Sequence, residues 1–177
     1  MGYCTQILNG LNLDCEKSFG GIRRVFLANY ADVTSIEKDT DGFINSISMA
    51  GNAKFKEYEC VKNTGSMVSN LTINETAGSN FVTTELNLVF VKQDAIKQQE
   101  MEKLQNAHLV CVVEDANSNW WYLGADNYVY ASGGCANSGV NLTDANSFSI
   151  TLTDISAEYP YWVTQGVINQ VIGTPAG

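Results

Sequence analysis

Few residues of this chain have the type and spacing that catalysis or metal binding requires. His108 is the only histidine, so a triad built on an imidazole base would have to include it. Carboxylates occur as close pairs at Asp39 and Asp41 and at Glu114 and Asp115, and such pairs can act as general acid and base or bind a metal ion. We interpret His108 as a helix-end or half-buried residue and both pairs as solvated turn residues.

The cysteines and glycines indicate neither a metal site nor a nucleotide site. The cysteines have wide, irregular gaps and form no C-x-x-C pair; they are Cys4, Cys15, Cys60, Cys111 and Cys135. Cys111 lies in an apolar run, where a cysteine acts as a small hydrophobic residue. The glycines of segment 132–139 lack the spacing of a phosphate-binding loop. We therefore predict that the protein is not an enzyme and has no catalytic, cofactor-binding or metal-binding residues.

A group of aromatic residues suggests a different function, the stacking of a sugar or a peptide on flat rings. The group consists of Trp120, Trp121, Tyr122, Tyr128 and Tyr130. Strand alternation places Trp120 and Tyr122 on one face of a strand and Trp121 on the other. At least one of these faces is expected in the core, so packing in the core or between subunits is favoured over ligand binding.

Composition favours a single acidic domain. The chain has 177 residues, of which 45% are hydrophobic, and no linker rich in Pro or Ser divides it. Ten basic and nineteen acidic residues give a formal net charge of −9, which disfavours a surface that grips nucleic acid. The N-terminus lacks a basic segment followed by a long apolar run, and no apolar run reaches the length of a membrane span. We expect a cytosolic protein at synthesis, with no membrane partner.

The elements that would position these side chains are clearest between residues 81 and 124. Segment 81–91 alternates at period two, which predicts a half-buried strand. Its buried face consists of Val82, Thr84, Leu86, Leu88 and Phe90. Segment 92–107 changes to a helical period, which predicts a surface helix with one apolar stripe. That stripe consists of Ile96, Met101, Leu104 and Ala107.

Strands are predicted on both sides of this pair. The apolar run 108–114 predicts a central strand, and a polar turn at 115–119 joins it to strand 120–124 as a hairpin. Shorter or weaker strand patterns occupy 22–30, 36–38, 43–49, 55–61, 66–75, 128–131, 147–152 and 162–172, with a flexible loop at 132–139. The fold class is therefore mainly β (α+β), a β-sandwich or barrel with one flanking α-helix and long β-ribbons.

The long ribbons and the first residues point beyond a single subunit. The ribbons between residues 55 and 90 alternate polar side chains and bury little on their own, which favours a subunit interface. Residues 1–20 are aperiodic and predict an N-terminal arm lying on another surface. We expect this arm to be followed by one β domain at 21–173 and a C-terminal tail at 174–177.

In these segments the chain resembles the tail-tube type of structural protein of tailed bacteriophages, in particular phages that infect Bacteroides-like gut bacteria. The resemblance covers nearly the whole chain. The residues that carry it are Gly20 to Val33, Thr84 to Phe90, Leu109 to Asp115, Trp121 to Gly124, Gly139 to Asp144 and Ser147 to Thr153. These motifs are architectural, so they do not separate a tail tube from a neck, connector or tail-terminator ring.

The resemblance implies a virion subunit that assembles into rings, as a hexamer by family likeness, stacked around a DNA channel in a tail tube or neck. Its partners would be copies of itself and other tail or neck proteins, and genomic DNA would pass without specific binding. It would be made in the host cytoplasm and reside in the virion. A head-decoration or fibre-associated module that binds a host glycan through surface aromatics is the alternative, and a small hydrolase using scattered carboxylates is the least favoured.

Overall fold

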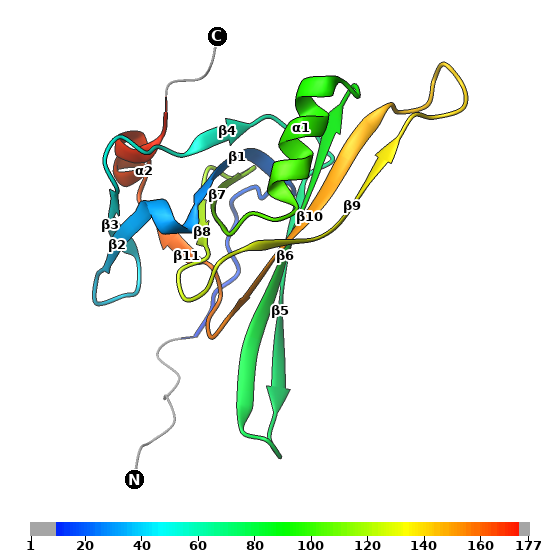
Figure 1. The fold of residues 1–177 in the computed structure, drawn as a ribbon. Helices are drawn as coiled ribbons and strands as arrows, with labels where there is room; N and C mark the ends of the chain where they lie inside the picture. Colours follow the sequence, from blue (N-terminus) through cyan, green and yellow to red (C-terminus); the bar gives the residue numbers. More distant parts are fainter. Residues whose placement is uncertain (1–9, 174–177) are drawn as a thin grey trace.

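The computed structural model describes residues 10–173 as two β-sheets and two α-helices (Figure 1). The strands of the larger sheet are β1 Ile22–Asn29, β2 Val33–Lys38, β3 Ile44–Met49, β4 Lys56–Tyr58, β7 Leu109–Asp115, β8 Trp120–Leu123 and β11 Tyr161–Val163. The strands of the smaller sheet are β5 Ser66–Asn74, β6 Ser79–Val91, β9 Tyr130–Asn137 and β10 Ser147–Ser156. The helices are α1 Ala95–Leu104 and α2 Gln165–Val171, and a short 3₁₀ turn spans Tyr30–Asp32.

The larger sheet has the strand order β2-β3-β11-β8-β7-β1-β4, and the smaller one has the order β5-β6-β10-β9. Strands β3 and β11 run parallel, and the other neighbouring strands run antiparallel. The predicted fold class is confirmed, because the protein is mainly β, with its two sheets packed in the manner of a β-sandwich.

Two hydrophobic clusters divide the interior into layers. One lies between the sheets and joins Val25, Cys111 and Val113 of the larger sheet to Leu86 and Leu152 of the smaller one. The other lies on the opposite face of the larger sheet, beneath α2, and includes Phe26, Val112, Tyr122, Val167 and Ile168. The larger sheet is therefore covered on both faces near its middle. The predicted central strand is confirmed, since β7 is buried along nearly its whole length.

Strand β6 shows the alternation that its sequence predicts. All five side chains assigned to its buried face are buried, at 7% exposure or less. Strand β10 continues the pattern, because Ile150 pairs with Leu88 and Leu152 pairs with Leu86 in register. Alternate side chains of β6 and β10 therefore form one wall of the core and leave the others on the outer face of the smaller sheet.

The predicted helix is present but shorter than expected, and one residue of its predicted apolar stripe is not buried. Helix α1 begins at Ala95, because Lys92 takes a left-handed φ of 65° and the carboxylate of Asp94 accepts the backbone N–H of Lys97 at 2.8 Å as an N-cap. Leu104 is buried, whereas Ile96 is 81% exposed. Only the C-terminal half of α1 reaches the core.

Two segments differ in type from the sequence prediction. The predicted loop 132–139 is mostly strand, because β9 pairs with β10 from Tyr130 to Asn137, with a register shift at Ser132. Segment 162–172 forms the short strand β11 and then α2, whose buried residues Val167, Ile168 and Val171 have helical spacing. Packing against the larger sheet outweighs the strand preference of these β-branched residues.

The N-terminal arm is described from residue 10 onward, where residues 10–20 form neither helix nor strand and are exposed. The backbone N–H of Phe19 donates to Asn117 Oδ1 at 2.8 Å, which fixes the point where the arm joins the domain. The first nine residues of the predicted arm and the predicted tail at 174–177 lie outside the described residues.

Candidate functional site

The residues considered for catalysis are explained by local structure. His108 is exposed, and its ring stacks on Tyr128 with ring centroids 3.8 Å apart and planes 12° apart. Tyr30 and Tyr130 pack edge-on against the same tyrosine. His108 therefore belongs to a surface aromatic cluster at the end of β7.

One member of each acidic pair, Asp39 or Asp115, stabilises a turn, whereas the prediction of a solvated turn residue is wrong for Glu114, which is buried in β7 with Arg23 Nη1 3.9 Å from its Oε1. Asp39 Oδ1 accepts the backbone N–H groups of Asp41 and Phe43, each at 2.9 Å. Burial raises the pKa of the Asp115 carboxyl, but hydrogen bonds from the backbone N–H of Asn119 and the indole of Trp121 outweigh burial and leave that pKa below its ordinary value. Asp115 is therefore an anchor for the β7–β8 turn.

Among the described residues, neither a metal site nor a reactive cysteine site is assembled. No group of three or more His, Cys, Asp or Glu side chains between residues 10 and 173 is arranged to hold a metal ion. Cys15, Cys60, Cys111 and Cys135 are all free thiols. Burial raises the pKa of Cys60 to about 11 and that of Cys111 further still, so neither supplies a thiolate at neutral pH.

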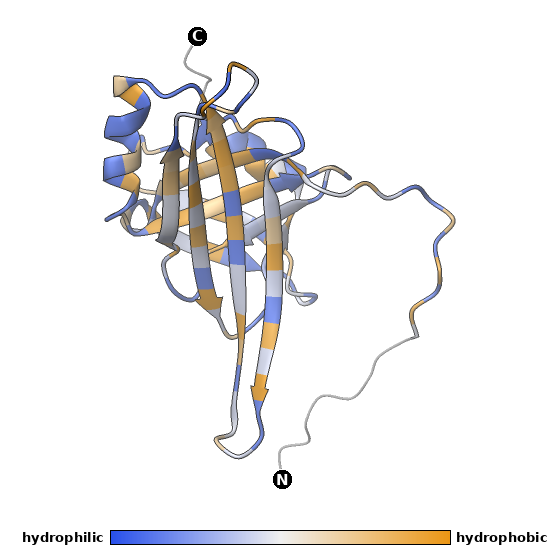
Figure 2. Cartoon of the chain, turned by 90° about the vertical axis from the view of Figure 1, so that its right-hand side faces the viewer, coloured by the Kyte–Doolittle hydropathy of each residue, from blue (hydrophilic) through white to orange (hydrophobic). Residues whose placement is uncertain are grey.

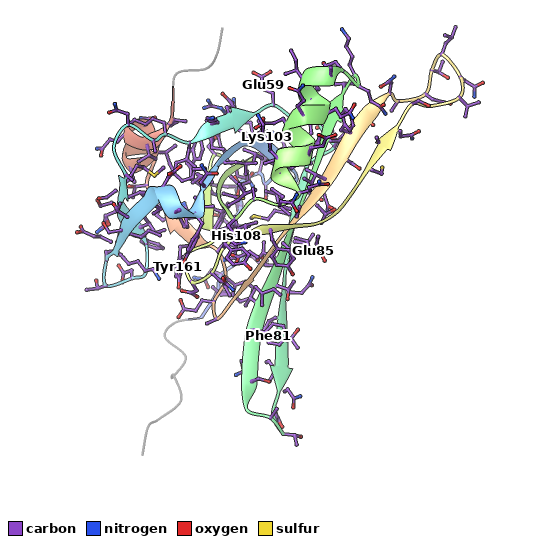
Figure 3. All side chains as sticks on the ribbon, in the orientation of Figure 1. Glu59, Phe81, Glu85, Lys103, His108 and Tyr161 are labelled. Carbon is purple, nitrogen blue, oxygen red and sulfur yellow. The ribbon has the colours of Figure 1, made fainter. Side chains whose placement is uncertain are left out.

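No helix or strand of the described range covers the outer face of the smaller sheet, which faces the viewer in Figure 2. Hydroxyl and amide groups bridge its strands. Thr151 Oγ1 donates to Asn87 Oδ1 at 2.7 Å, and Thr153 Oγ1 donates to Ser132 Oγ at the same distance. Glu85, labelled in Figure 3, is the only residue on this face whose side chain is charged at neutral pH. The face combines these polar groups and one acidic side chain with the exposed apolar residues Val68, Val91 and Ile155.

Both edges of the smaller sheet are open. Within residues 10–173, β5 pairs only with β6, and β9 pairs only with β10. Each edge strand therefore presents backbone N–H and C=O groups that a further strand could pair with. In β9 a Cβ on Gly134 would lie 2.7 Å from the carbonyl oxygen of Ser149, so only glycine permits this close approach of β9 to β10.

The β5–β6 hairpin extends past the body of the protein as a ribbon (Figure 1). Its registered pairs place Leu71 beside Val82 and Ile73 beside Asn80. Val82 is buried, but Leu71 and Ile73, on the same face further along the ribbon, are 45% and 60% exposed. The ribbon therefore carries a core-type face beyond the core.

A groove of about 420 Å³ lies at the opposite edge of the same sheet. Helix α1 forms one wall, and β9 and β10 form the other; the residues that line it include Met101, Gln105, Ala131, Gly133, Phe148 and Ile150. Figure 2 shows α1 standing beside the β9 edge. We call this feature the α1 groove.

A second hollow, of about 400 Å³, is lined by aromatic rings. Trp162 pairs with Trp121 across β11 and β8, and Phe43 meets Trp162 edge-on with ring centroids 4.8 Å apart. The aromatic group predicted from sequence is thus divided: Trp120 and Tyr122 are buried as expected, and only Trp121 lines the hollow. Phe43 and Trp162 were missed because strand register brings them together from distant segments.

Comparisons with known proteins do not indicate a function for this chain. No protein family, curated protein or solved structure matches the chain. None of the helices in the described range combines the length and apolarity needed to cross a membrane. The open edges, the uncovered face and the two hollows are therefore the features from which a function is argued.

Proposed function

We propose that this chain is a structural subunit whose smaller sheets join edge to edge into a closed ring, forming part of the tail tube or neck of a tailed bacteriophage around the DNA channel. The observation that carries the proposal is the pair of open edges, β5 and β9, on a sheet with one face that no other element of the described range covers and that carries no basic side chain. On this proposal the protein is not an enzyme and uses no cofactor. Its partners are copies of itself and other tail or neck proteins.

Strand direction supports head-to-tail closure. The smaller sheet has four strands, each antiparallel to its neighbours. Because four is even, β5 of the next copy, turned only about the ring axis, would run antiparallel to β9. Every junction would then repeat the pairing found inside the sheet, and closure would remove both edges.

The two faces of the sheet differ enough to assign an inside and an outside. One face is buried beneath the larger sheet, so the uncovered face is the one that can line a lumen. Its hydroxyl and amide groups offer no array of cations to phosphate, and Glu85 adds one negative charge per copy. Such a wall repels DNA weakly and lets it slide. Six copies are expected by family likeness.

Electron micrographs of concentrated protein test the ring, and a charge reversal tests the lumen. We expect rings with a central hole and weak binding of duplex DNA at low salt. Glu85→Lys should keep the ring and raise DNA affinity at least about tenfold, with a steep salt dependence, because several lysines would face the same duplex. Glu37→Lys, at an exposed position on β2 at the far edge of the larger sheet, makes the same charge change off the lumen, so its effect should be much smaller.

Two results would count against the proposal. One is a protein that stays monomeric at every concentration, and the other is tight, salt-sensitive binding of duplex DNA by the unmodified chain. Equal gains in DNA affinity from Glu85→Lys and Glu37→Lys would retain the ring but reject the assignment of its lumen.

The aromatic hollow favours a second candidate, a virion surface module that binds a host glycan. Phe43 and Trp162 are 36% and 37% exposed, and Asp41 and Asn119 lie at the rim, where they could accept hydrogen bonds from sugar hydroxyls. Glycan-array binding that is lost in both Trp121→Ala and Trp162→Ala would support this module. A tube or neck subunit should show no such binding.

A further inference from the structure

We infer that the α1 groove is the docking site for the ribbon of the neighbouring copy, and that Leu71 and Ile73 of that ribbon fill it. The inference rests on the proposed ring. It adds the side-chain contact that would hold each junction, in addition to the backbone pairing of the two sheet edges.

The ribbon supplies the apolar side chains. Leu71 and Ile73 lie on the face of β5 that belongs to the core side of the sheet, as their pairing with β6 shows. In the single subunit about half of each side chain remains exposed. Thr72, between them, points to the uncovered outer face. A partner for this ribbon must therefore offer an apolar surface on the core side of a sheet.

The α1 groove offers such a surface. Phe148 and Ile150 pair with Phe90 and Leu88, so they point to the core side of the sheet, and Met101 faces them from α1. Strand β9 carries small residues where it borders the groove, among them Gly133 and Gly134. The floor is therefore open toward the β9 edge, where β5 of a neighbour would pair, and α1 would lie over that added strand.

The geometry of a closed barrel brings the ribbon of one copy and the α1 groove of its neighbour to the same height along the ring axis. If the strands ran parallel to the ring axis, the register across the sheet would place Val68 of the next copy level with Tyr130. Strands about 4.8 Å apart and tilted by about 40° shift a copy four strands away by about 16 Å, or about five residues. The right-handed coil of barrel strands raises the copy that joins at the β9 edge in Figure 2. Because paired residues share a face, the shift must be an even number of residues, and a shift of about six places Ile73 level with Ala131, which packs on the core side.

The N-terminal arm is the competing occupant. Leu11 and Leu13 are fully exposed and also lack apolar partners among the described residues. In Figure 2 the arm leaves the domain on the β5 side and the groove lies on the β9 side, so the arm is distant from the groove of its own copy, and only the groove of the neighbouring copy lies on its side. The ribbon is the favoured occupant, because pairing of the sheet edges would fix its position beside α1, whereas residues 10–20 form no strand that could pair there.

Charge substitutions on alternate ribbon residues provide the first test. Leu71→Asp and Ile73→Asp should each weaken ring formation at least about tenfold in sedimentation, because they place a carboxylate in the apolar groove. Thr72→Asp makes the same chemical change on the opposite face and should weaken it far less. All three positions are exposed in the single subunit, so each variant should keep the melting temperature of the monomer.

Disulfide capture locates the contact. In a background with Cys4, Cys15, Cys60 and Cys135 changed to Ser, one batch carries Leu71→Cys and another carries Met101→Cys. Mild oxidation of the mixture should give a covalent dimer that neither batch gives alone, and Thr72→Cys mixed with Met101→Cys should give little. A dimer from Leu13→Cys with Met101→Cys instead would assign the groove to the arm and overturn the inference.

The outcomes separate the inference from the proposed function. Rings that form normally with Leu71→Asp and Ile73→Asp, together with no disulfide to position 101, would leave the ring proposal intact and reject the ribbon contact. A chain that forms no ring at any concentration and gives no mixed disulfide would reject both.

Discussion

At the scale of single residues, Asp154 is the clearest site of electrostatic cost. Its side chain is only 4% exposed; one carboxylate oxygen accepts the backbone N–H of Gly124 at 3.1 Å, and the other accepts Ser156 Oγ at 2.8 Å. Burial raises the pKa of this carboxyl above its ordinary value, and these two hydrogen bonds only partly offset that rise. Gly124 itself has a φ of 92°, so the contact fixes a backbone conformation that suits glycine.

This site predicts a decline of stability with pH. Between the ordinary carboxyl pKa, about 3.9, and the higher folded-state pKa, the folded protein binds more protons than the unfolded chain, so stability falls as pH rises through that window. Asp154→Asn keeps an oxygen acceptor for Gly124 and removes the titration. Melting temperatures across this range should therefore fall less steeply for the variant than for the wild type. Equal slopes would show that Asp154 is not the group responsible, and Glu75→Gln, at an exposed position in the β5–β6 turn, serves as the control.

At the scale of elements, helix α1 has its own N-cap and ion pairs, and few of its side chains reach the core. Asp94 caps its first turn, and Lys97 and Lys103 form ion pairs with Asp94 and Glu100. Such exposed pairs contribute little stability. The attachment of α1 to the domain depends on Leu104 and, to a lesser extent, on Met101.

Truncating the two apolar ends of this helix should have unequal effects. Leu104→Ala should lower the free energy of unfolding by about 2–4 kcal/mol, because it leaves a cavity in the core between the sheets. Ile96→Ala should change it by less than about 0.5 kcal/mol, because that side chain is 81% exposed. Urea denaturation followed by tryptophan fluorescence measures both. Similar losses from both variants would mean that Ile96 is covered in solution.

The same elements show what sequence can and cannot predict. β6 and β7 were predictable because burial imposes period two on one and continuous apolarity on the other. β9 was not, because an edge strand of Ser and Gly is held by backbone pairing and leaves no side-chain pattern. α2 was missed because its β-branched residues favour a strand until the larger sheet is present to pack against. The aromatic hollow required the register of β3, β8 and β11, which local pattern does not contain.

At the scale of the whole molecule, we expect the domain to fold without the N-terminal arm. Phe19 and Ser18 contact Asn117, but the arm before them extends away from the folded body (Figure 2). Deleting residues 1–19 should therefore leave the melting temperature within about 2 °C of the full chain, in keeping with small effects of exposed residues. It should weaken stacking of rings or docking to other virion proteins, as light scattering would report. A deletion that unfolds the domain would contradict this division.

The four-stranded width of the smaller sheet has a dimensional consequence. Each copy would add four strands to the circumference, so at a spacing of about 4.8 Å and a tilt of about 40° the diameter grows by about 8 Å per copy. Six copies give a barrel about 48 Å across by the same estimate, wide enough for hydrated duplex DNA, whereas three give half that width. The diameter of such a ring therefore increases in steps of four strands, and the width of the DNA sets the smallest number of copies that the ring can contain.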